Sequence, residues 1–392
     1  MKILFLTSRI PYPLDKGDKL RAYNFIKELS KNNEIILCSI CDEKVHPKAE
    51  SELNKFCKSF YIFNINKLGI LASLLKAVFS KLPFQVAYFT NTSIQKSIDE
   101  IVANEKPDII YYQLVRMAKY AQNNSIPKFL DYMDVLSVGI EKRIEQEPFY
   151  KKWIFNLEFE RLKKYEDEVF GRFKKQSIIT EQDRDLIPTR SKHQIEIVSN
   201  GVDFDYFIPP QKVYEKRFDI VFSGNMAYPP NVVCAVYLVK KIMPLVWSKN
   251  KNVKVVIVGT SPSKQVLELA SENVYITGRV EDIRTYFYES KIFVAPLFMN
   301  TGLQNKLLEA MAMKTPCITS SVANNALKAT PSLDLLIADN ENEFADSILS
   351  LLSNENEMKK ISESAYNFIF KNHNWSAIGN QLNQLLIGTK ND

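Results

Sequence analysis

Two charged residues near position 300 have the spacing and the surroundings of a ligand-binding pair. Lys306 and Glu309 are three residues apart, so a helix would place both side chains on one face. The strand-like run Lys291–Pro296 precedes them, and the spacing of Thr301 and Gln304 predicts a capping box that begins the helix at Thr301. A cation and a carboxylate just after a helix N-terminus, at the end of a parallel strand, suit an anionic, hydroxyl-rich ligand. The alternative is an exposed ion pair without a ligand.

The stretch from Phe298 to Thr319 resembles the nucleotide-contacting helix of family-4 retaining glycosyltransferases, which have the two-domain GT-B fold. That family carries two glutamates at a fixed spacing, and the second accepts hydrogen bonds from the ribose of a nucleotide-sugar. Glu309 matches the second glutamate, whereas Thr301 stands where the first should be. The first glutamate helps to hold the donor sugar, so the sugar contacts stay open. The Gly-Leu-Gln-Asn-Lys variant is closer to a bacterial subgroup associated with exopolysaccharide or surface-glycan assembly.

Other stretches resemble the same enzymes in the same order along the chain. They are residues 198–203 between the domains, 220–225 at the first strand of the donor domain, 275–280 in the loop over the donor, 9–19 in the first loop of the acceptor domain, and 131–134 with paired aspartates. Because the order and spacing of these stretches agree, the resemblance extends over nearly the whole chain.

A nucleotide-sugar donor needs hydrogen-bond donors for its diphosphate, an acceptor for its ribose and a shape that fits its sugar. Backbone N–H groups at helix starts can bind the phosphates. The family adds an arginine and a lysine after the strand that matches 220–223, and this chain has neither there. The resemblance therefore leaves Lys306 and Arg279 to neutralise the departing diphosphate and Glu309 to hold the ribose. The expected donor-binding residues are Gly224, Asn225, Gly278, Arg279, Thr301, Gly302, Gln304, Asn305, Lys306 and Glu309.

The first half of the chain should bind the acceptor. The glycine of Gly17-Asp18-Lys19 would let backbone approach a ligand, although Asp18 could equally be a helix N-cap. Asp131 and Asp134 follow a predicted strand, and Asp134 could orient or deprotonate an acceptor hydroxyl; a strand-end turn is the alternative. Asp134, Lys306 and Arg279 are thus the expected catalytic residues. No other general base stands out, which fits a retaining transfer in which the leaving phosphate accepts the proton.

Composition and length favour a globular enzyme with two domains. The chain has 392 residues, which is too long for one ordinary core, and it is 46% hydrophobic and 24% charged. Its net charge of +6 is not concentrated in a tail, so it suits small anions or an anionic membrane surface and does not indicate nucleic-acid binding. There is no run of eighteen apolar residues, and the first apolar run is short, so we expect neither a membrane span nor a signal peptide. The expected location is the cytoplasm.

The cysteines and histidines do not predict a redox or metal site. Five cysteines without a secretion signal indicate reduced thiols, and Cys38 and Cys41 are interpreted as half-buried strand residues. The histidines are scattered, and the pattern Asp203-Phe-Asp205 is interpreted as a surface turn. We therefore expect no metal and no cofactor beyond the nucleotide-sugar substrate.

Strand-like runs alternate with helical patterns, which predicts α/β architecture with two doubly wound Rossmann-like domains whose parallel sheets face a cleft. The predicted strands are 3–7, 35–40, 59–63, 108–112, 128–131, 177–180, 219–223, 253–258, 274–276, 292–295 and 317–319. The predicted boundaries are 1–200 for the acceptor-side domain, 201–215 for the linker, 216–370 for the donor domain and 371–392 for a C-terminal helix. By analogy with GT-B proteins, that helix crosses back to the first domain.

Two helical stretches need separate interpretation. Residues 67–82 are apolar with three lysines, which predicts either an interfacial helix on anionic lipid or, as we favour, a buried helix whose lysines reach the surface. Residues 141–175 are rich in charge and predict one long amphipathic surface helix.

Together these observations predict a metal-independent, retaining glycosyltransferase of polysaccharide biosynthesis, acting on a glycan or lipid-linked hydroxyl. Peripheral contact with the inner membrane surface is part of that expectation, and the sequence leaves the oligomeric state open. Two alternatives remain. One is a catalytically degenerate relative that serves as a nucleotide-binding or scaffold subunit, and the other is a nucleotide-sugar epimerase of similar build.

Overall fold

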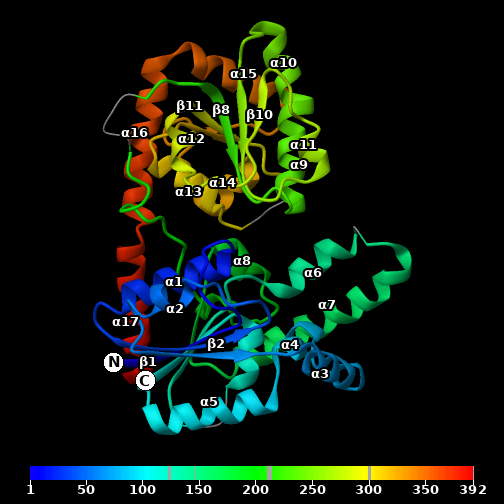
Figure 1. The fold of residues 1–392 in the computed structure, drawn as a ribbon, viewed down its shortest axis with the longest axis vertical. Coiled ribbons are helices and arrows are strands. Elements are labelled where there is room, and N and C mark those ends of the chain that lie inside the picture. The colour runs from blue at the N-terminus through cyan, green and yellow to red at the C-terminus, as the bar shows by residue number, and fades with distance from the viewer. Residues whose placement is uncertain (122–124, 146, 210–213, 299–301, 392) are drawn as a thin grey trace. The chain divides into compact units, whose positions relative to one another are not determined.

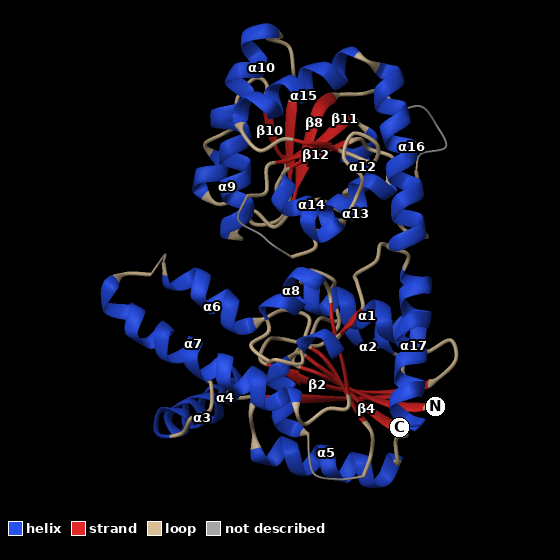
Figure 2. Cartoon of the chain, turned by 180° about the vertical axis from the view of Figure 1, so that it is seen from behind, coloured by secondary structure: helices blue, strands red, loops and turns tan. Residues whose placement is uncertain are grey.

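The computed structural model describes residues 1–121, 125–145, 147–209, 214–298 and 302–391. The chain divides into two compact units (Figure 1). The first unit comprises Met1–Ser199 together with Trp375–Asp392, and the second comprises Asn200–Asn374. Each unit is a parallel sheet with helices on its faces (Figure 2). The predicted α/β class, with two Rossmann-like domains, is confirmed.

The first unit is built on a seven-stranded sheet of order β3-β2-β1-β4-β5-β6-β7, in which every strand pair is parallel. Its strands are β1 (Lys2–Thr7), β2 (Glu34–Cys41), β3 (Ser59–Asn64), β4 (Ile109–Gln113), β5 (Lys128–Asp131), β6 (Lys175–Ile178) and β7 (Glu196–Ile197). Its helices are α1 (Gly17–Leu29), α2 (Ala49–Leu53), α3 (Lys67–Phe79), α4 (Phe84–Phe89), α5 (Thr92–Glu105), η1 (Val115–Tyr120), α6 (Leu136–Ile144), α7 (Phe149–Phe170), α8 (Glu181–Leu186), η2 (Lys192–Gln194) and α17 (Trp375–Asn391).

The second unit has a six-stranded parallel sheet of order β10-β9-β8-β11-β12-β13. Its strands are β8 (Phe218–Ser223), β9 (Val255–Val258), β10 (Val274–Ile276), β11 (Ser290–Ala295), β12 (Cys317–Thr319) and β13 (Leu336–Ile337). Its helices are α9 (Pro229–Tyr237), η3 (Leu238–Ile242), α10 (Met243–Lys249), α11 (Lys264–Leu267), α12 (Arg284–Tyr288), α13 (Asn305–Ala312), α14 (Ser321–Leu327), α15 (Glu341–Ser353) and α16 (Glu355–Asn372).

The central strands are buried on both faces, which is why they are nearly continuous apolar runs in the sequence. In β1 every residue after Lys2 is buried, and all of β9 is buried. Each predicted strand is present, with bounds shifted by one or two residues where they differ. The edge strands β7 and β13 were not predicted, because two residues carry too little periodicity to be recognised.

The C-terminal helix α17 packs against the first unit. It lies beside α1 (Figure 1), and Trp375 makes an edge-to-face contact with Phe25. Gly379 has no side chain at the contact with α1, where an added Cβ would lie 2.5 Å from the Cβ of Glu28. Residues 202–208, which were predicted as linker, belong to the second unit, since the N–H of Val202 donates to the carbonyl of His373.

The two helical stretches of the first unit differ from their predictions. The segment predicted as one helix over 141–175 folds as α6 and α7, which form a hairpin that extends from the unit (Figure 1). The favoured buried helix at 67–82 is wrong, because Ala77 is the only residue of α3 that is buried. Leu68 and Phe79 are 78% and 92% exposed. Periodicity identified these helices but could not tell whether another element covers their apolar sides.

One segment, Pro229–Lys249, is long and apolar enough to cross a membrane, with a mean hydropathy of 1.3 over its window, of which half is buried in the protein. It comprises α9, η3 and α10, and it buries Leu238, Ile242 and Val246 in the core of the second unit. Its apolar character therefore reflects core packing in this fold.

Candidate functional site

In the second unit, the expected donor residues gather where the order of the strands reverses. The chain progresses outward from β8 through β9 to β10 on one side and from β11 to β13 on the other, so β8 and β11 flank the switch point. Open parallel sheets bind ligands at the carboxyl ends of such strands. Gly224 and Asn225 directly follow β8, and α13 follows β11.

Helix α13 begins at Asn305, not at the predicted Thr301. Residues 302–304 are not helical, and Gln304 is the N-cap, whose side chain donates from Nε2 to the carbonyl of Gly302. Thr301 lies outside the described residues. The short helix still places Lys306, its second residue, and Glu309, its fifth, three residues apart, so the predicted spacing on one face is confirmed.

Lys306 is held at the switch point by a chain of amides. Its Nζ donates to Oδ1 of Asn231 at 2.5 Å, and Nδ2 of Asn231 donates to the carbonyl of Asn225 at 2.9 Å. The ammonium also lies 5.2 Å from the centroid of the Phe222 ring. Desolvation lowers the pKa of Lys306 to about 8, with a smaller opposing effect of Glu309. No carboxylate is recorded in an ion pair with Lys306 among the described residues, so its charge is available to an anion.

Glu309 is partly buried, and no hydrogen bond or ion pair of its carboxylate is recorded within the described ranges. Desolvation raises its pKa to about 7, and the nearby charge of Lys306 opposes the rise. Removing a carboxylate partly from water without a protein partner costs free energy, unless a ligand supplies hydrogen bonds to it. Glu309 can accept two such bonds from neighbouring hydroxyl groups.

Two glycines let the loops after β8 and β9 approach each other. A Cβ on Gly259 would lie 1.6 Å from the carbonyl oxygen of Gly224, and a Cβ on Gly224 would lie 2.7 Å from Nδ2 of Asn231. Both positions therefore require glycine by packing. The close fit fixes Asn225 and Asn231, and through them Lys306.

The remaining predicted donor residues lie around this core. Asn305 opens α13, and its Oδ1 accepts from Nδ2 of Asn200 at 3.3 Å. Gly278 has a φ of +68° and open space around it, and the exposed Arg279 follows it after β10. Since β9 separates β10 from β8, Arg279 stands one strand further from the switch point than Lys306.

In the first unit, Asp131 is fully buried in an internal network. Its Oδ2 accepts from Nε of Arg21 at 2.6 Å and from the hydroxyl of Tyr111 at 2.7 Å. Its Oδ1 accepts from Nη2 of Arg21 and from Oγ of Ser177, both at 3.0 Å. Arg21 also donates to the carbonyls of Val198 and Ser199. The network ties α1 to the sheet, which gives Asp131 a structural role in place of the acceptor contact expected from the sequence.

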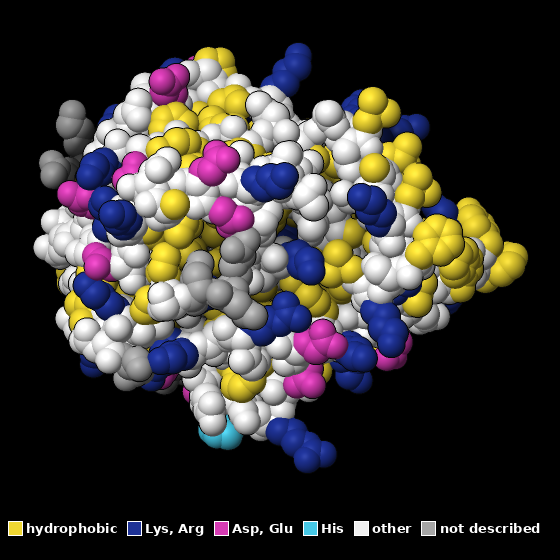
Figure 3. All heavy atoms as spheres, turned by 90° about the horizontal axis from the view of Figure 1, so that it is seen from below, with side chains coloured by type: hydrophobic (Ala, Val, Ile, Leu, Met, Phe, Trp, Pro, Cys, Tyr) yellow, Lys and Arg dark blue, Asp and Glu magenta, His cyan; other side chains and the backbone are white. Residues whose placement is uncertain are grey.

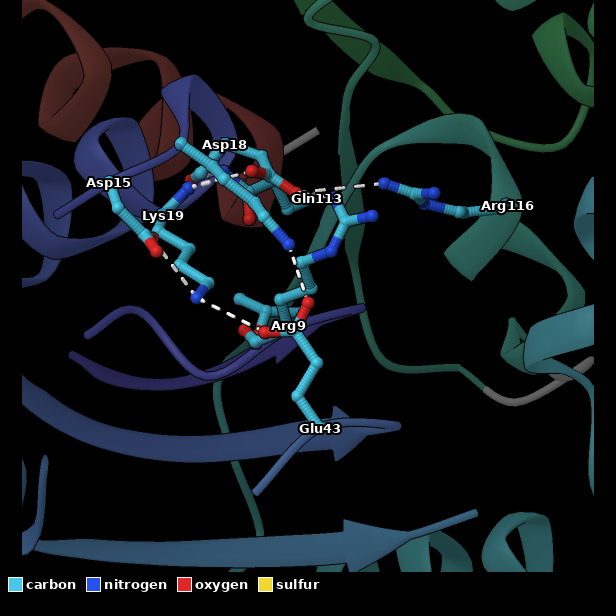
Figure 4. A network of polar contacts seen from close by, with 9 residues as sticks. Arg9, Asp15, Asp18, Lys19, Glu43, Gln113 and Arg116 are labelled. Carbon is cyan, nitrogen blue, oxygen red and sulfur yellow. Dashed lines mark hydrogen bonds and ion pairs between the residues drawn. The ribbon is translucent and has the colours of Figure 1, made fainter. Parts of the chain in front are cut away.

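The Gly17-Asp18-Lys19 segment is the first turn of α1, so Asp18 is not the N-cap that the alternative interpretation required; Lys16 stands there. Figure 4 shows the polar network around it. Asp18 accepts at Oδ2 from Nη1 of Arg9, at 2.6 Å. Lys19 is 5% exposed and pairs with Asp15 at 3.1 Å and with Glu43 at 3.6 Å. A Cβ on Gly17 would meet nothing within 4 Å.

Asp134 follows β5 by three residues, and its side chain reaches solvent. Desolvation raises the pKa of its carboxyl to about 6, and the carboxylates of Asp183 and Asp18 add to the rise. A carboxyl group with such a pKa can exchange a proton near neutral pH. Of the two paired aspartates, Asp134 is therefore the one with a chemically available side chain.

Other sequence interpretations concern residues outside these sites. Asp203 accepts at Oδ1 from the N–H groups of Asp205 and Tyr206, which is the expected turn. Cys38 and Cys41 lie on β2 and are buried, not half-buried; burial raises the pKa of Cys38 to about 12. In the described part of the chain, no group of three His, Cys, Asp or Glu side chains is placed to hold a metal.

The sequence analysis did not identify the residues that hold the predicted site residues in place. Asn231 holds Lys306, and its only sequence signal is a polar residue in the first turn of a helix that follows a parallel strand. Arg9 and Arg116 meet at Asp18 although they lie far apart in the chain. No local pattern predicts that meeting.

Comparison with known proteins identifies a glycosyltransferase domain in the second unit. Residues 217–354, which lie in the second unit, match the family model described as "Glycosyl transferases group 1". A relative from Klebsiella pneumoniae, described as an uncharacterised 44.6 kDa protein in the cps region, is 22% identical over 391 residues. That match covers 95% of this chain and 96% of the relative.

Solved structures share the fold over the full chain. Anabaena Alr3699/HepE in complex with UDP superposes with a TM-score of 0.72 at 13% identity, covering 99% of this chain and 100% of that one. Sucrose-phosphate synthase from Thermosynechococcus elongatus gives 0.71 at 14% identity, covering 98% of both chains. The chain therefore has the GT-B fold, and with the matched domain it is a glycosyltransferase of the GT-B type.

Proposed function

We propose that this GT-B glycosyltransferase is a retaining, metal-independent enzyme of glycan or polysaccharide assembly. The bond from the anomeric carbon to the nucleotide diphosphate breaks, and a bond to an acceptor hydroxyl forms with the same configuration. The acceptor proton passes to the departing diphosphate oxygen. The relative in a cps region supports the assignment to polysaccharide assembly.

The donor half of this proposal rests on one observation: Lys306 and Glu309 share one face of α13, which follows β11 at the switch point of the second sheet. The ammonium of Lys306 would neutralise the diphosphate, and the carboxylate of Glu309 would accept from the ribose hydroxyls. Arg279 and the N–H groups that precede α13 would complete the diphosphate contacts. The structure of HepE with UDP makes a uridine diphosphate the first donor nucleotide to test.

Binding of UDP to a Glu309→Gln variant tests the donor half. Losing hydrogen bonds to a charged acceptor costs about 1.5–3 kcal/mol, so the affinity should fall about 10- to 100-fold by calorimetry. Glu268→Gln is the matched control, because Glu268 is an exposed glutamate of the same unit that pairs with Lys264 at the surface. Equal affinity of the Glu309→Gln variant and the wild type would place the nucleotide elsewhere.

Two alternatives give different products. A scaffold subunit would bind the nucleotide without turnover, whereas a transferase hydrolyses its donor slowly in the absence of an acceptor. An epimerase would change the sugar configuration and leave the nucleotide attached. Incubating the purified chain with UDP-sugars and analysing products by NMR distinguishes the three, and retention is read from the anomeric coupling of the transferred sugar.

We further propose that the enzyme works at the surface of an anionic membrane. The carrying observation is an exposed apolar surface of the first unit, which we call the α3–α7 surface. It consists of Leu68, Leu71, Leu75, Val78 and Phe79 on α3 and of Phe149, Tyr150, Trp153, Ile154 and Leu157 on α7, all at least 37% exposed. Figure 3 shows hydrophobic side chains clustered at the edge of the molecule where α3 and α7 lie in Figure 1, with basic side chains beside them.

The two parts of this surface are joined. Arg161 of α7 donates from Nη1 to the carbonyls of Ala77 and Leu82 and from Nη2 to that of Val78, so α7 is attached at the end of α3. Leu157 lies one helical turn before Arg161 and Ile154 a further turn away, on the same side of α7. The exposed apolar residues of α7 therefore begin one turn from the point where α7 is attached to α3.

The charges of this surface match anionic lipid. Residues 67–81 and 149–157 contain Lys67, Lys76, Lys81, Lys151 and Lys152 and no acidic residue. Each lysine near an anionic bilayer contributes about 1 kcal/mol, and the apolar side chains enter the interface. An enzyme bound in this way would lie at the membrane interface, where the head group of a lipid-linked acceptor is located.

Sedimentation with vesicles tests the membrane proposal. The protein should bind vesicles of phosphatidylcholine with phosphatidylglycerol and bind pure phosphatidylcholine poorly. The triple variant Phe79→Ser, Phe149→Ser, Trp153→Ser should lose binding at least tenfold, whereas Val233→Ser with Leu267→Ser, two exposed apolar residues of the second unit, should not. Dimers that dissociate in the triple variant, without any vesicle binding by the wild type, would instead assign the patch to self-association.

A further inference from the structure

Two arginines meet at the switch point of the first sheet. In the order β3-β2-β1-β4-β5-β6-β7, β1 and β4 flank the point where the direction reverses. Arg9 follows β1 by two residues, and Arg116 follows β4 by three, in η1. The carboxyl ends of these neighbouring strands are the place where a doubly wound sheet binds its ligand.

Both guanidinium groups share one carboxylate oxygen (Figure 4). Nη1 of Arg9 lies 2.6 Å and Nη2 of Arg116 lies 3.6 Å from Oδ2 of Asp18. The other oxygen of Asp18 accepts from the N–H of Lys19. Lys19 itself is paired with Asp15 and Glu43, so these carboxylates serve a different cation. Arg9, Arg116 and Asp18 together carry a charge of +1, and the carboxylates of Asp42 and Asp134 lie within electrostatic range of the arginines.

Several donors that follow β1 and β4 at this edge of the sheet are buried and have no protein partner. Within the described ranges, Nε of Arg9, Nε of Arg116 and Oγ of Ser8 make no hydrogen bond. Arg116 is 9% exposed and Ser8 is 1% exposed. A buried donor without a partner costs about 1–3 kcal/mol, and more if it is charged. Three such donors at one sheet edge indicate a group that binds there.

The environment of Arg116 destabilises its positive charge, so a bound anion would stabilise it. Its guanidinium carbon lies 4.7 Å from the centroid of the Phe89 ring, which holds the planar group by one face. Desolvation lowers the pKa of Arg116 to about 10, and the positive charge of Arg9 lowers it further than the carboxylate of Asp18 can restore. An added oxyanion would relieve both effects.

We propose that Arg9, Arg116 and Ser8 form a binding site for a phosphoryl group of the acceptor substrate. A phosphoryl group offers several oxygens to two guanidinium groups and a hydroxyl. The acceptor class is thus a phosphorylated or phosphate-linked glycan or lipid precursor. The inference rests on the proposed function, which makes the first unit the acceptor side.

Pyrophosphate is the probe, and calorimetry on the full chain is the measurement. Because pyrophosphate can also occupy the donor site, the titration uses a Lys306→Met background. Binding should remain there and should weaken at least tenfold on adding Arg116→Gln, Arg9→Gln or Ser8→Ala. Ser8→Ala and Arg9→Gln keep the test valid if Arg116→Gln does not fold. Arg217→Gln, an exposed arginine paired with Glu289, is the control and should change nothing.

The outcomes separate this site from the proposed function. If pyrophosphate binds and requires Arg116 but no UDP-sugar is ever turned over, the anion site stands and the transferase mechanism fails. If UDP-sugars are turned over and pyrophosphate binding in the Lys306→Met background is absent or indifferent to Ser8, Arg9 and Arg116, the phosphoryl site is wrong. Acetate binding as tightly as pyrophosphate would also overturn it, because the site would then prefer a carboxylate.

Discussion

The two switch points of this protein use the same sheet geometry and different sources of charge. In the second unit, one helix supplies both Lys306 and Glu309. In the first unit, the charges come from separate loops, with Arg9 after β1 and Arg116 after β4, and Asp18 of α1 holds them together. The second site places one cation near one carboxylate, whereas the first brings two guanidinium groups to a single carboxylate oxygen.

This difference indicates how each site is positioned. The position of Lys306 and Glu309 depends on the packing of α13, which the amide chain through Asn231 and the close glycines maintain. The position of Arg9 and Arg116 depends on the packing of α1 against the sheet, which the buried pair of Arg21 and Asp131 maintains. A substitution that disrupts the contacts around Asn231 should therefore destabilise the second unit alone. A substitution that disrupts the pair of Arg21 and Asp131 should destabilise the first unit alone.

Asp131→Asn should have the largest effect and should act on the first unit. Removing one partner of a fully buried ion pair costs about 3–5 kcal/mol, because the other charge stays buried. Chemical denaturation should show an early transition of the first unit, while UDP affinity stays near that of the wild type. Glu289→Gln, which breaks a more exposed pair, should change stability by less than about 1 kcal/mol. A loss of UDP binding in Asp131→Asn would contradict the separation of the two supports.

Lys306→Met should have the next largest effect, on catalysis. Removing one group that stabilises a developing negative charge costs about 2.7–4 kcal/mol, which is a 100- to 1,000-fold loss in kcat. Steady-state kinetics with the donor sugar measure it, and uridine, which lacks phosphates, should bind both forms equally. Lys264→Met is the control, since this lysine is 91% exposed. A wild-type kcat would exclude Lys306 from the reaction.

Gly259→Ala should disturb the second unit through its backbone. The added Cβ would overlap the carbonyl of Gly224, and overpacking typically costs about 1–3 kcal/mol. Thermal unfolding should show the loss, together with weaker UDP binding as the loop after β8 moves. Gly388→Ala in α17 is the matched control, because nothing lies within 4 Å of its Cβ, and alanine in a helix should stabilise by about 0.5–1 kcal/mol. Equal effects of the two substitutions would refute the close approach of the loops.

The pH dependence of UDP binding should be the mildest effect. The pKa of Glu309 is raised to about 7, so the carboxylate that accepts from ribose forms as the pH rises through that value. The pKa of Lys306 is lowered to about 8, so the ammonium is lost as the pH rises further. Affinity should peak between these values. In Glu309→Gln the acidic limb should disappear, and in Lys306→Met the alkaline limb should disappear; limbs that persist in both variants would assign the titration to other groups.

The sequence predicted the placement of Lys306 and Glu309 better than that of Asp131 and Asp134. Lys306 and Glu309 were recognised because a helix repeats every few residues, and local spacing alone puts them on one face. Asp131 and Asp134 look alike in the sequence, yet one is fully buried against Arg21 and the other reaches solvent. The helix over 67–79 was recognised as a helix, but its exposure depended on which elements fold over it.

The sequence by itself determined the alternation of strands and helices, and from it the two parallel sheets. The strands could be recognised because a strand that is buried on both faces has a nearly continuous apolar sequence. It also determined that Lys306 and Glu309 lie on one face of a helix, which needs only helical geometry. Tertiary structure alone decided the meeting of Arg9, Arg116 and Asp18 and the exposure of α3. Those features depend on which distant segments become neighbours, and contacts between distant segments leave no periodic signal in one sequence.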